Sequence, residues 1–282
     1  LDFSTLAARK ARCDDELRLN RRLAPDVYLE VAALTADAAG RLSVAGDGAP
    51  VEWLVKMRRL PRDRMLDVAL ASGMVRDEDI GALAEVLSTF YRRLAPVRLS
   101  LADYRARLTA DIEACRKELG DPTHGLPGES FAGTAEVLLA FIANESDLLK
   151  ARLGAGRIVE GHGDLRPEHV CLLERPVVID CLEFNREFRV LDVADELAYL
   201  AMECARLGAP GVGDALFTAC CERMGDPVPP RLFRFYCAYR ALVRAKIAAW
   251  HSKDVPLAEI EKWHTRARQY LALAATYAHA RG

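Results

Sequence analysis

The sequence predicts an α+β fold in which one helix and a few antiparallel strands precede a mainly helical remainder. Residues 27–57 contain β-branched runs separated by a Gly-Asp-Gly turn. From about residue 65 the apolar positions recur at helical spacing, and only short β-like runs near 157–180 interrupt them. The 282 residues are enough for about two domains, or one domain in two lobes. We expect an N-terminal unit over 1–60 and a C-terminal unit over 61–282, divided near Arg58–Pro61.

The N-terminal unit begins with a predicted helix over residues 4–23. Ser4 or Thr5 is a suitable N-cap, and Pro25 prevents the helix from continuing. Three strands are predicted to follow, over 27–35, 41–45 and 51–57. The turn at 46–48 joins two of them and favours an antiparallel hairpin.

The C-terminal unit is predicted to be helical except around residues 157–180. The predicted helices cover 77–94, 100–119, 135–153, 193–207, 213–224, 229–252 and 256–280. Residues 120–133 are rich in Gly and Pro and are expected to form a loop. Short strands are expected at 157–161, 170–173 and 177–180, and the last two are close enough in sequence to form a tight hairpin.

Composition excludes several classes of protein. There are 39 basic and 41 acidic residues, so the formal charge of −2 disfavours a protein that coats nucleic acid. The sequence has no apolar run of 18 residues, so no membrane span is expected. The segment after Leu1 is charged and does not resemble a secretory signal. Eight cysteines without a C-x-x-C pair indicate free thiols in a reducing, cytoplasmic environment.

The segment from residue 160 to 195 carries the candidate chemistry. Asp164 follows one short predicted strand, and Asp180 ends another, 16 residues later. A β-hairpin between them would bring both acids to the same end. Two converging carboxylates suit a divalent hard cation and a general base, which are the parts that phosphoryl transfer needs.

The motifs HGDLRPEH at 162–169 and VVIDCLEF at 177–184 resemble the catalytic loop and metal-binding strand of aminoglycoside phosphotransferase-like kinases. Segments 1–6, 16–29, 55–61 and 240–246 also resemble one subfamily, whose members are often fused to a P-loop ATP-binding domain. The resemblance implies a protein-kinase-like, two-lobe fold with a truncated N-terminal lobe and a mainly helical C-terminal lobe. It also implies ATP and Mg²⁺ as cofactors, with the catalytic loop and metal-binding hairpin over 157–184.

The resemblance assigns roles to individual residues. Asp164 would be the catalytic base, and Arg166 would neutralise the transferring phosphoryl group. Asp180 would bind Mg²⁺. His162 would pack the loop, and Asp195 would tie the loop to the following helix.

The expected cofactor-binding residues are Glu16, Met57, Arg58 and His169. Glu16 would pair with a lysine that anchors ATP, and residues 56–61 would form the hinge against adenine. His169 stands where the family usually has Asn, so it would contact the metal or a phosphate. A second departure is that only fifteen residues precede Glu16, too few for the Gly-rich hairpin and strand lysine of the family, and Lys10 lies on the same predicted helix.

Three functions remain open from the sequence. The first is an ATP- and Mg²⁺-dependent phosphotransferase that acts on the hydroxyl of a small molecule. The second is a degenerate kinase-like module that binds nucleotide, or a regulatory partner, without turnover. The third is a metal hydrolase using His162, Asp164, His169 and Asp180. The cationic residues Arg240, Arg244 and Lys246 form either a solvated helix face or a wall for an anionic substrate.

Overall fold

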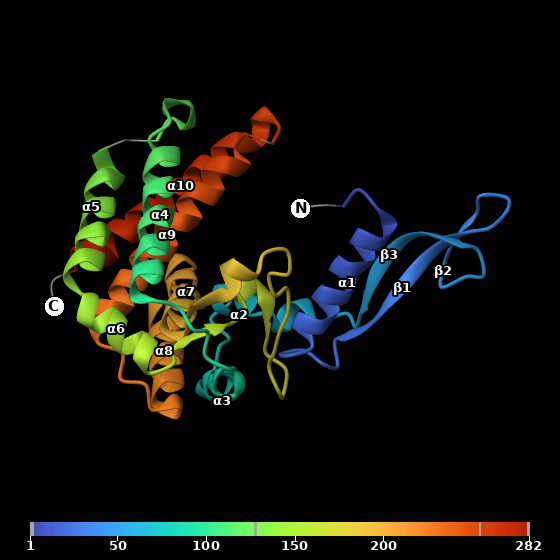
Figure 1. Ribbon diagram of the computed structural model, residues 1–282, viewed down its shortest axis with the longest axis horizontal. Coiled ribbons are helices and arrows are strands. Elements are labelled where there is room, and N and C mark those ends of the chain that lie inside the picture. The colour runs from blue at the N-terminus through green and yellow to red at the C-terminus, as the bar shows by residue number, and fades with distance from the viewer. Residues whose placement is uncertain (1–2, 127–128, 254, 281–282) are drawn as a thin grey trace.

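The computed structural model describes residues 3–126, 129–253 and 255–280 and has the predicted α+β architecture (Figure 1). A small antiparallel sheet with one helix lies at one end, and a helical body lies at the other. The N-terminal elements are α1 (Leu6–Asn20), β1 (Tyr28–Ala36), β2 (Leu42–Val44) and β3 (Ala49–Met57).

The N-terminal sheet has the strand order β2-β1-β3, and both pairings of β1 are antiparallel. The three predicted strands and their antiparallel pairing are therefore present, but the hairpin predicted across the turn at 46–48 is wrong, because β2 and β3 each pair with the central β1 and not with each other. Thr5 is the N-cap of α1, since its hydroxyl accepts a hydrogen bond of 3.1 Å from the amide of Ala8. Gly48 is required at the turn because a Cβ there would lie 2.2 Å from the carbonyl oxygen of Ala36.

The helical body is built around α7 (Val193–Arg206), which is buried over most of its length and packs against α8, α9 and α10. Three of its residues make hydrogen bonds to other segments. Glu196 and Tyr199 bind the loop at 162–164, and Glu203 binds Tyr270. The other helices are α2 (Leu66–Ala71), α3 (Asp77–Arg93), α4 (Leu101–Leu119), α5 (Glu129–Asn144), α6 (Ser146–Gly154), α8 (Pro210–Met224), α9 (Pro230–His251) and α10 (Leu257–His279).

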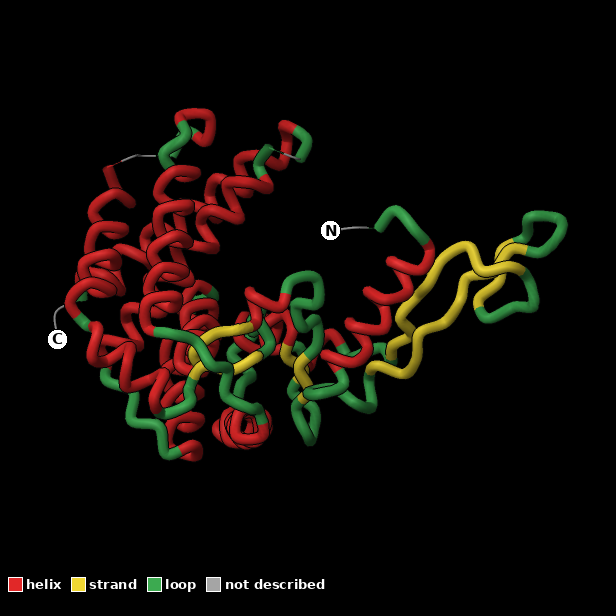
Figure 2. The backbone as a smooth tube through the Cα atoms, in the orientation of Figure 1, coloured by secondary structure: helices red, strands yellow, loops and turns green. Residues whose placement is uncertain are grey.

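Loops and very short strands connect the sheet to the helical body (Figure 2). Strand β5 (Val170–Cys171) pairs with β6 (Val177–Val178) as the predicted hairpin. Strand β4 (Ile158–Glu160) pairs with β7 (Val190–Asp192). A small apolar cluster of Ala24, Val27 and Tyr28 joins the sheet to the β5–β6 hairpin, because Val177 and Ile179 pack against it.

Three local expectations were wrong. The loop predicted over 120–133 is shorter, because α5 already begins at Glu129, although 127 and 128 lie outside the described residues. The helix predicted over 135–153 is two helices, α5 and α6, which meet at Glu145. Strand β7 was not predicted, because three residues are too short to show a pattern and the strand with which it pairs lies about thirty positions earlier in the chain.

The eight cysteines are all free, and seven of them are buried. This agrees with the prediction of free thiols. Among the described residues, no helix has both the length and the apolar character that a bilayer crossing requires.

Candidate functional site

The β5–β6 hairpin brings Asp164 and Asp180 together at one end, with His169 between them. Ligand atoms of these three residues all lie within 4.8 Å of one another. The hairpin is held by its ladder and by the amide of Ile179, which donates to the carbonyl oxygen of His169 at 2.9 Å. The spacing of 16 residues therefore produces the convergence that the sequence predicted.

The carboxylate of Asp164 is partly open to solvent, with 24% of its side chain exposed. Tyr199 of α7 donates a hydrogen bond of 2.9 Å to Oδ1. Arg166 lies 2.9 Å from Oδ2 and also forms an ion pair of 2.7 Å with Glu168. The two carboxylates hold the Arg166 guanidinium beside Asp164, where it is mostly buried.

Glu196 of α7 fixes the loop that carries Asp164. Its carboxylate accepts hydrogen bonds from the amides of His162 (2.9 Å) and Gly163, and from the hydroxyl of Tyr91 (2.7 Å). A Cβ at Gly161 would lie 2.4 Å from Glu196 Oε2. The buried carboxylate thus needs glycine at Gly161 in order to approach the backbone closely.

Gly163 has φ of +89°, and a Cβ there would meet Leu182 at 3.2 Å, the carbonyl oxygen of Phe188 at 3.3 Å and Arg189 at 3.0 Å. We expect Gly163→Ala to lower the free energy of unfolding by about 1–3 kcal/mol, since it combines strain with crowding. Urea denaturation measures the loss. The matched control is Gly211→Ala in α8, where a Cβ meets nothing within 4 Å. Equal stability of the two variants would contradict the assigned strain.

His162 is buried, and both of its ring nitrogens are occupied. Nε2 donates to the carbonyl oxygen of Ile179 at 2.9 Å, and Nδ1 accepts from the amide of Asp164 at 3.3 Å. Burial lowers the pKa of His162 to about 4, with a smaller contribution from His169. A neutral imidazole with two backbone partners supports the loop and has no nitrogen left for a metal.

Asp180 has φ of +62°, a left-handed conformation that is uncommon outside glycine. The backbone is held there by α1 and β1, because the hydroxyl of Tyr28 accepts from the Asp180 amide at 3.1 Å and Asn20 accepts from the Cys181 amide at 2.8 Å. The Asp180 side chain remains 65% exposed. A carboxylate that a strained backbone holds open to solvent is suited to bind a ligand.

His169 lies between the two acids. Its Nδ1 contacts the carbonyl oxygen of Asp164 at 2.9 Å, and Nε2 is 3.1 Å from both Asp180 Oδ2 and Arg166. Burial is the largest influence on the pKa of His169 and lowers it, but the hydrogen bond to Asp180 together with the charges of Asp164 and Asp180 leaves the pKa raised. The same hydrogen bond lowers the pKa of Asp180.

The residues of this site fit Mg²⁺ through their oxygen atoms. Asp164 and Asp180 offer carboxylates, and the exposed side of Asp180 leaves room for water or phosphate oxygens, which Mg²⁺ prefers. His169 is a poorer direct ligand for Mg²⁺ because it offers nitrogen. Its Nδ1 is already directed at the Asp164 carbonyl.

In the part of the chain that the structure describes, Glu16, one of the cofactor residues predicted in the N-terminal unit, does not have the lysine partner that was expected for it. Glu16 is half-buried in α1, and burial raises its pKa, followed by the charges of Glu183 and Asp180. Lys10 forms an ion pair of 2.7 Å with Asp14. Among the described residues, no lysine forms an ion pair with Glu16.

Met57 and Arg58 lie where β3 ends. The amide of Arg58 donates to the carbonyl oxygen of Val27 at 2.8 Å, and the side chain of Met57 is exposed. Met57 therefore ends the sheet and Arg58 follows it, which is the position predicted for the hinge. Their contact with a nucleotide stays a prediction.

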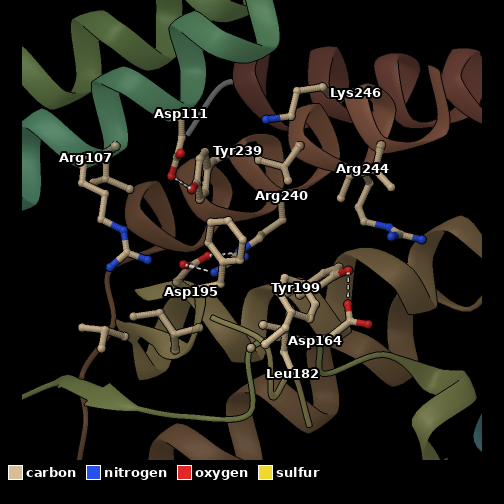
Figure 3. Close-up of a pocket in the computed structure, with 18 of the residues that line it drawn as sticks. Arg107, Asp111, Asp164, Leu182, Asp195, Tyr199, Tyr239, Arg240, Arg244 and Lys246 are labelled. Atoms are coloured by element: carbon tan, nitrogen blue, oxygen red, sulfur yellow. Dashed lines mark hydrogen bonds and ion pairs between the residues drawn. The ribbon is translucent and has the colours of Figure 1, made fainter. Parts of the chain in front are cut away.

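Asp164 also borders a pocket of about 420 Å³, which lies between α4, α7, α9 and the segment 182–191 (Figure 3). Asp164 and Gly163 form part of its lining. Sequence inspection did not find this pocket, because its walls come from segments more than one hundred residues apart.

Tyr199, Glu196, Tyr28 and Asn20 were also missed by the sequence analysis. Only Glu196 had a sequence signal, as an acid in the first turn of the helix after the catalytic segment. Asp195 was expected to tie the loop to that helix, and this was wrong. Its neighbour Glu196 does so, while Asp195 pairs with Arg240 of α9.

No known family model matches the chain. It is 32% identical over 251 residues to "Uncharacterized protein Rv2004c" of Mycobacterium tuberculosis and to "Uncharacterized protein Mb2027c" of Mycobacterium bovis. The match covers 87% of this chain and 48% of each relative. The chain thus spans about half the length of these relatives, which is consistent with an additional domain in them.

Proposed function

We propose that the chain is the catalytic part of an ATP- and Mg²⁺-dependent phosphotransferase that acts on the hydroxyl of a small molecule. The observation that carries this proposal is the convergence of Asp164 and Asp180 within one 4.8 Å cluster. The surrounding motifs at 162–169 and 177–184 resemble aminoglycoside phosphotransferase-like kinases. The additional domain of the relatives agrees with a fused P-loop ATP-binding domain.

In this proposal the two acids divide the work. Asp180 holds Mg²⁺, which when bound neutralises phosphate charge and aligns the nucleotide. Asp164 faces the pocket, where its carboxylate orients the acceptor hydroxyl and accepts its proton. Tyr199 and Arg166 keep this carboxylate in place through contacts of 2.9 Å each.

The kinase-like architecture is part of the same proposal. Helix α1 and the β2-β1-β3 sheet would form the truncated N-terminal lobe, and ATP would lie between this lobe and the helical body. Met57 and Arg58 would contact adenine through their backbone. Glu16 lies near Asp180, the proposed metal ligand, since the charge of Asp180 adds to burial and to the charge of Glu183 in raising the pKa of Glu16.

A nucleotide-binding module without turnover is the second candidate. Two observations favour it: Glu16 has no lysine partner among the described residues, and His169 replaces the oxygen ligand expected beside Asp180. The metal hydrolase is less well supported, because the two nitrogens of His162 are already bound to the backbone.

Nucleotide binding is tested by thermal denaturation with ATP, with and without MgCl₂. At ligand concentrations near one hundred times Kd, we expect the midpoint to rise by about 5 °C with both present. Asp180→Asn should remove the part of the rise that depends on magnesium. Asp147→Asn on α6, which is exposed, is the control and should behave like the wild type.

Turnover is measured separately, as ADP release by the protein at its natural length in the presence of candidate alcohols. Binding followed by acceptor-dependent ADP release supports the phosphotransferase. Binding without release for any acceptor supports the second candidate. If neither ATP nor magnesium shifts the midpoint, both candidates fail.

A further inference from the structure

We infer that the molecule held in the pocket beside Asp164 is an alcohol with an apolar or aromatic body and an anionic group. This inference rests on the proposed function for the identity of the reacting hydroxyl. The class of ligand follows from the walls of the pocket alone.

The pocket has a mainly apolar surface that suits a ring system. Six of its lining residues are Phe184, Phe188, Tyr199, Tyr239, Val243 and Trp250. Phe184 and Phe188 form an edge-to-face pair with centroids 6.1 Å apart, and they remain 40% and 49% exposed. A ligand in the pocket would cover these rings, which otherwise stay in contact with water.

The charged lining residues are not all neutralised. Asp195 pairs with Arg240, and Arg244 forms an ion pair of 3.1 Å with Glu203. Asp164 pairs with Arg166 at 2.9 Å. Because Glu203 also pairs with Arg206 and Arg166 also pairs with Glu168, these contacts cancel only part of the charge that faces the pocket.

Two cations remain, Arg107 of α4 and Lys246 of α9. Within the described part of the chain, no carboxylate lies at ion-pair distance from either one. Arg107 donates to the carbonyl oxygen of Glu187, and Lys246 lies 5.0 Å from the centroid of the Trp250 ring. Among the described residues that line the pocket, the only acid without a cationic partner is Asp111, which accepts a hydrogen bond of 2.9 Å from Tyr239. With one acid against two cations, this part of the pocket lining is net cationic.

The two cations lie away from the reacting end. Figure 3 shows Arg107 and Lys246 at two separate edges of the pocket, each away from Asp164, with Asp111 and Tyr239 between the two cations. A ligand whose anionic group contacts either cation would place its body against the rings and its hydroxyl near Asp164. A polycationic acceptor would instead meet two positive charges without a countercharge, which disfavours it.

The test uses three ligands that differ only in charge: 6-(hydroxymethyl)naphthalene-2-carboxylate, the matching carboxamide, and the matching aminomethyl compound. Binding to the chain is measured without nucleotide by ligand-observed NMR titration. We expect the carboxylate to bind about tenfold more tightly than the amide, and the amine most weakly. In Arg107→Gln with Lys246→Gln, the three affinities should agree within about threefold.

The control removes two cations from the same helices outside the pocket, by Lys117→Gln with Arg231→Gln. It should keep the preference for the carboxylate. Tightest binding of the amine, no binding of any probe, or an unchanged preference in the double pocket variant would each overturn the inference. If the carboxylate preference appears but no alcohol supports ADP release, the phosphotransferase proposal fails and the ligand class stands. If alcohols are phosphorylated but the cationic ligands are preferred, the phosphotransferase proposal stands and the inferred ligand class is wrong.

Discussion

Asp164→Asn is expected to reduce acceptor-dependent ADP release by about 10²- to 10⁴-fold, which is the usual contribution of a positioned general base. The amide has the same shape as the carboxylate and can still accept the hydrogen bond of Tyr199, but it cannot take the hydroxyl proton. The loss should appear in kcat rather than in nucleotide binding, because Asp180 is unchanged. Steady-state kinetics on the protein at its natural length measure the change.

Two controls separate loss of chemistry from loss of structure. Asp164→Asn should keep the ATP- and magnesium-dependent thermal shift, and Asp147→Asn on α6 should keep full activity. Activity of Asp164→Asn within about threefold of the wild type would show that another group accepts the proton. The role of Asp164 as catalytic base would then be wrong.

Arg152→Met is expected to lower the free energy of unfolding by about 3–5 kcal/mol, the largest structural effect foreseen here. Arg152 lies on α6 with 6% of its side chain exposed and binds two buried acids. It contacts both oxygens of Asp192, at 2.8 and 2.6 Å, and Asp226 at 2.9 Å. Asp192 also caps α7 and accepts from Tyr236. Without the guanidinium, Asp192 would be left buried without a countercharge, and Asp226 would keep only its 3.5 Å ion pair with Arg157.

Urea denaturation at neutral pH tests this effect, with Arg41→Met as the control. Arg41 also pairs with an acid, Asp37, but its side chain is 83% exposed. Such a surface pair contributes about 0–1 kcal/mol. Adding Asp192→Asn to Arg152→Met should restore part of the lost stability, since it removes the buried charge that is left without a cation. A loss below 1 kcal/mol for Arg152→Met would contradict the network.

The α+β class, the N-terminal strands and the pair of acids were predictable because they depend on local patterns. The β-branched runs indicate the three N-terminal strands but not their order in the sheet, and the short distance between β5 and β6 leaves the chain little choice but a hairpin. Asp164 and Asp180 flank this hairpin, so its closure brings them together. Strand β7 depends on a distant partner and showed no such local pattern.

The assignment of the loop support depended on the rotation of one helix. Asp195 and Glu196 are neighbours in sequence, but consecutive residues of an α-helix point about 100° apart. Glu196 faces the loop amides, and Asp195 faces Arg240. Which acid faces which partner is decided by how α7 packs between the loop and α9.

By itself, the sequence determined the class of fold and the two carboxylates that define the candidate site, because both follow from the order of short local elements. It left the cations of α9 open between a solvated face and a substrate wall. Only the tertiary structure shows how these cations are paired, because the net charge of a surface depends on what packs opposite. Asp195 pairs with Arg240, and Glu203 pairs with both Arg244 and Arg206, while Lys246 faces the pocket without a carboxylate among the described residues at ion-pair distance.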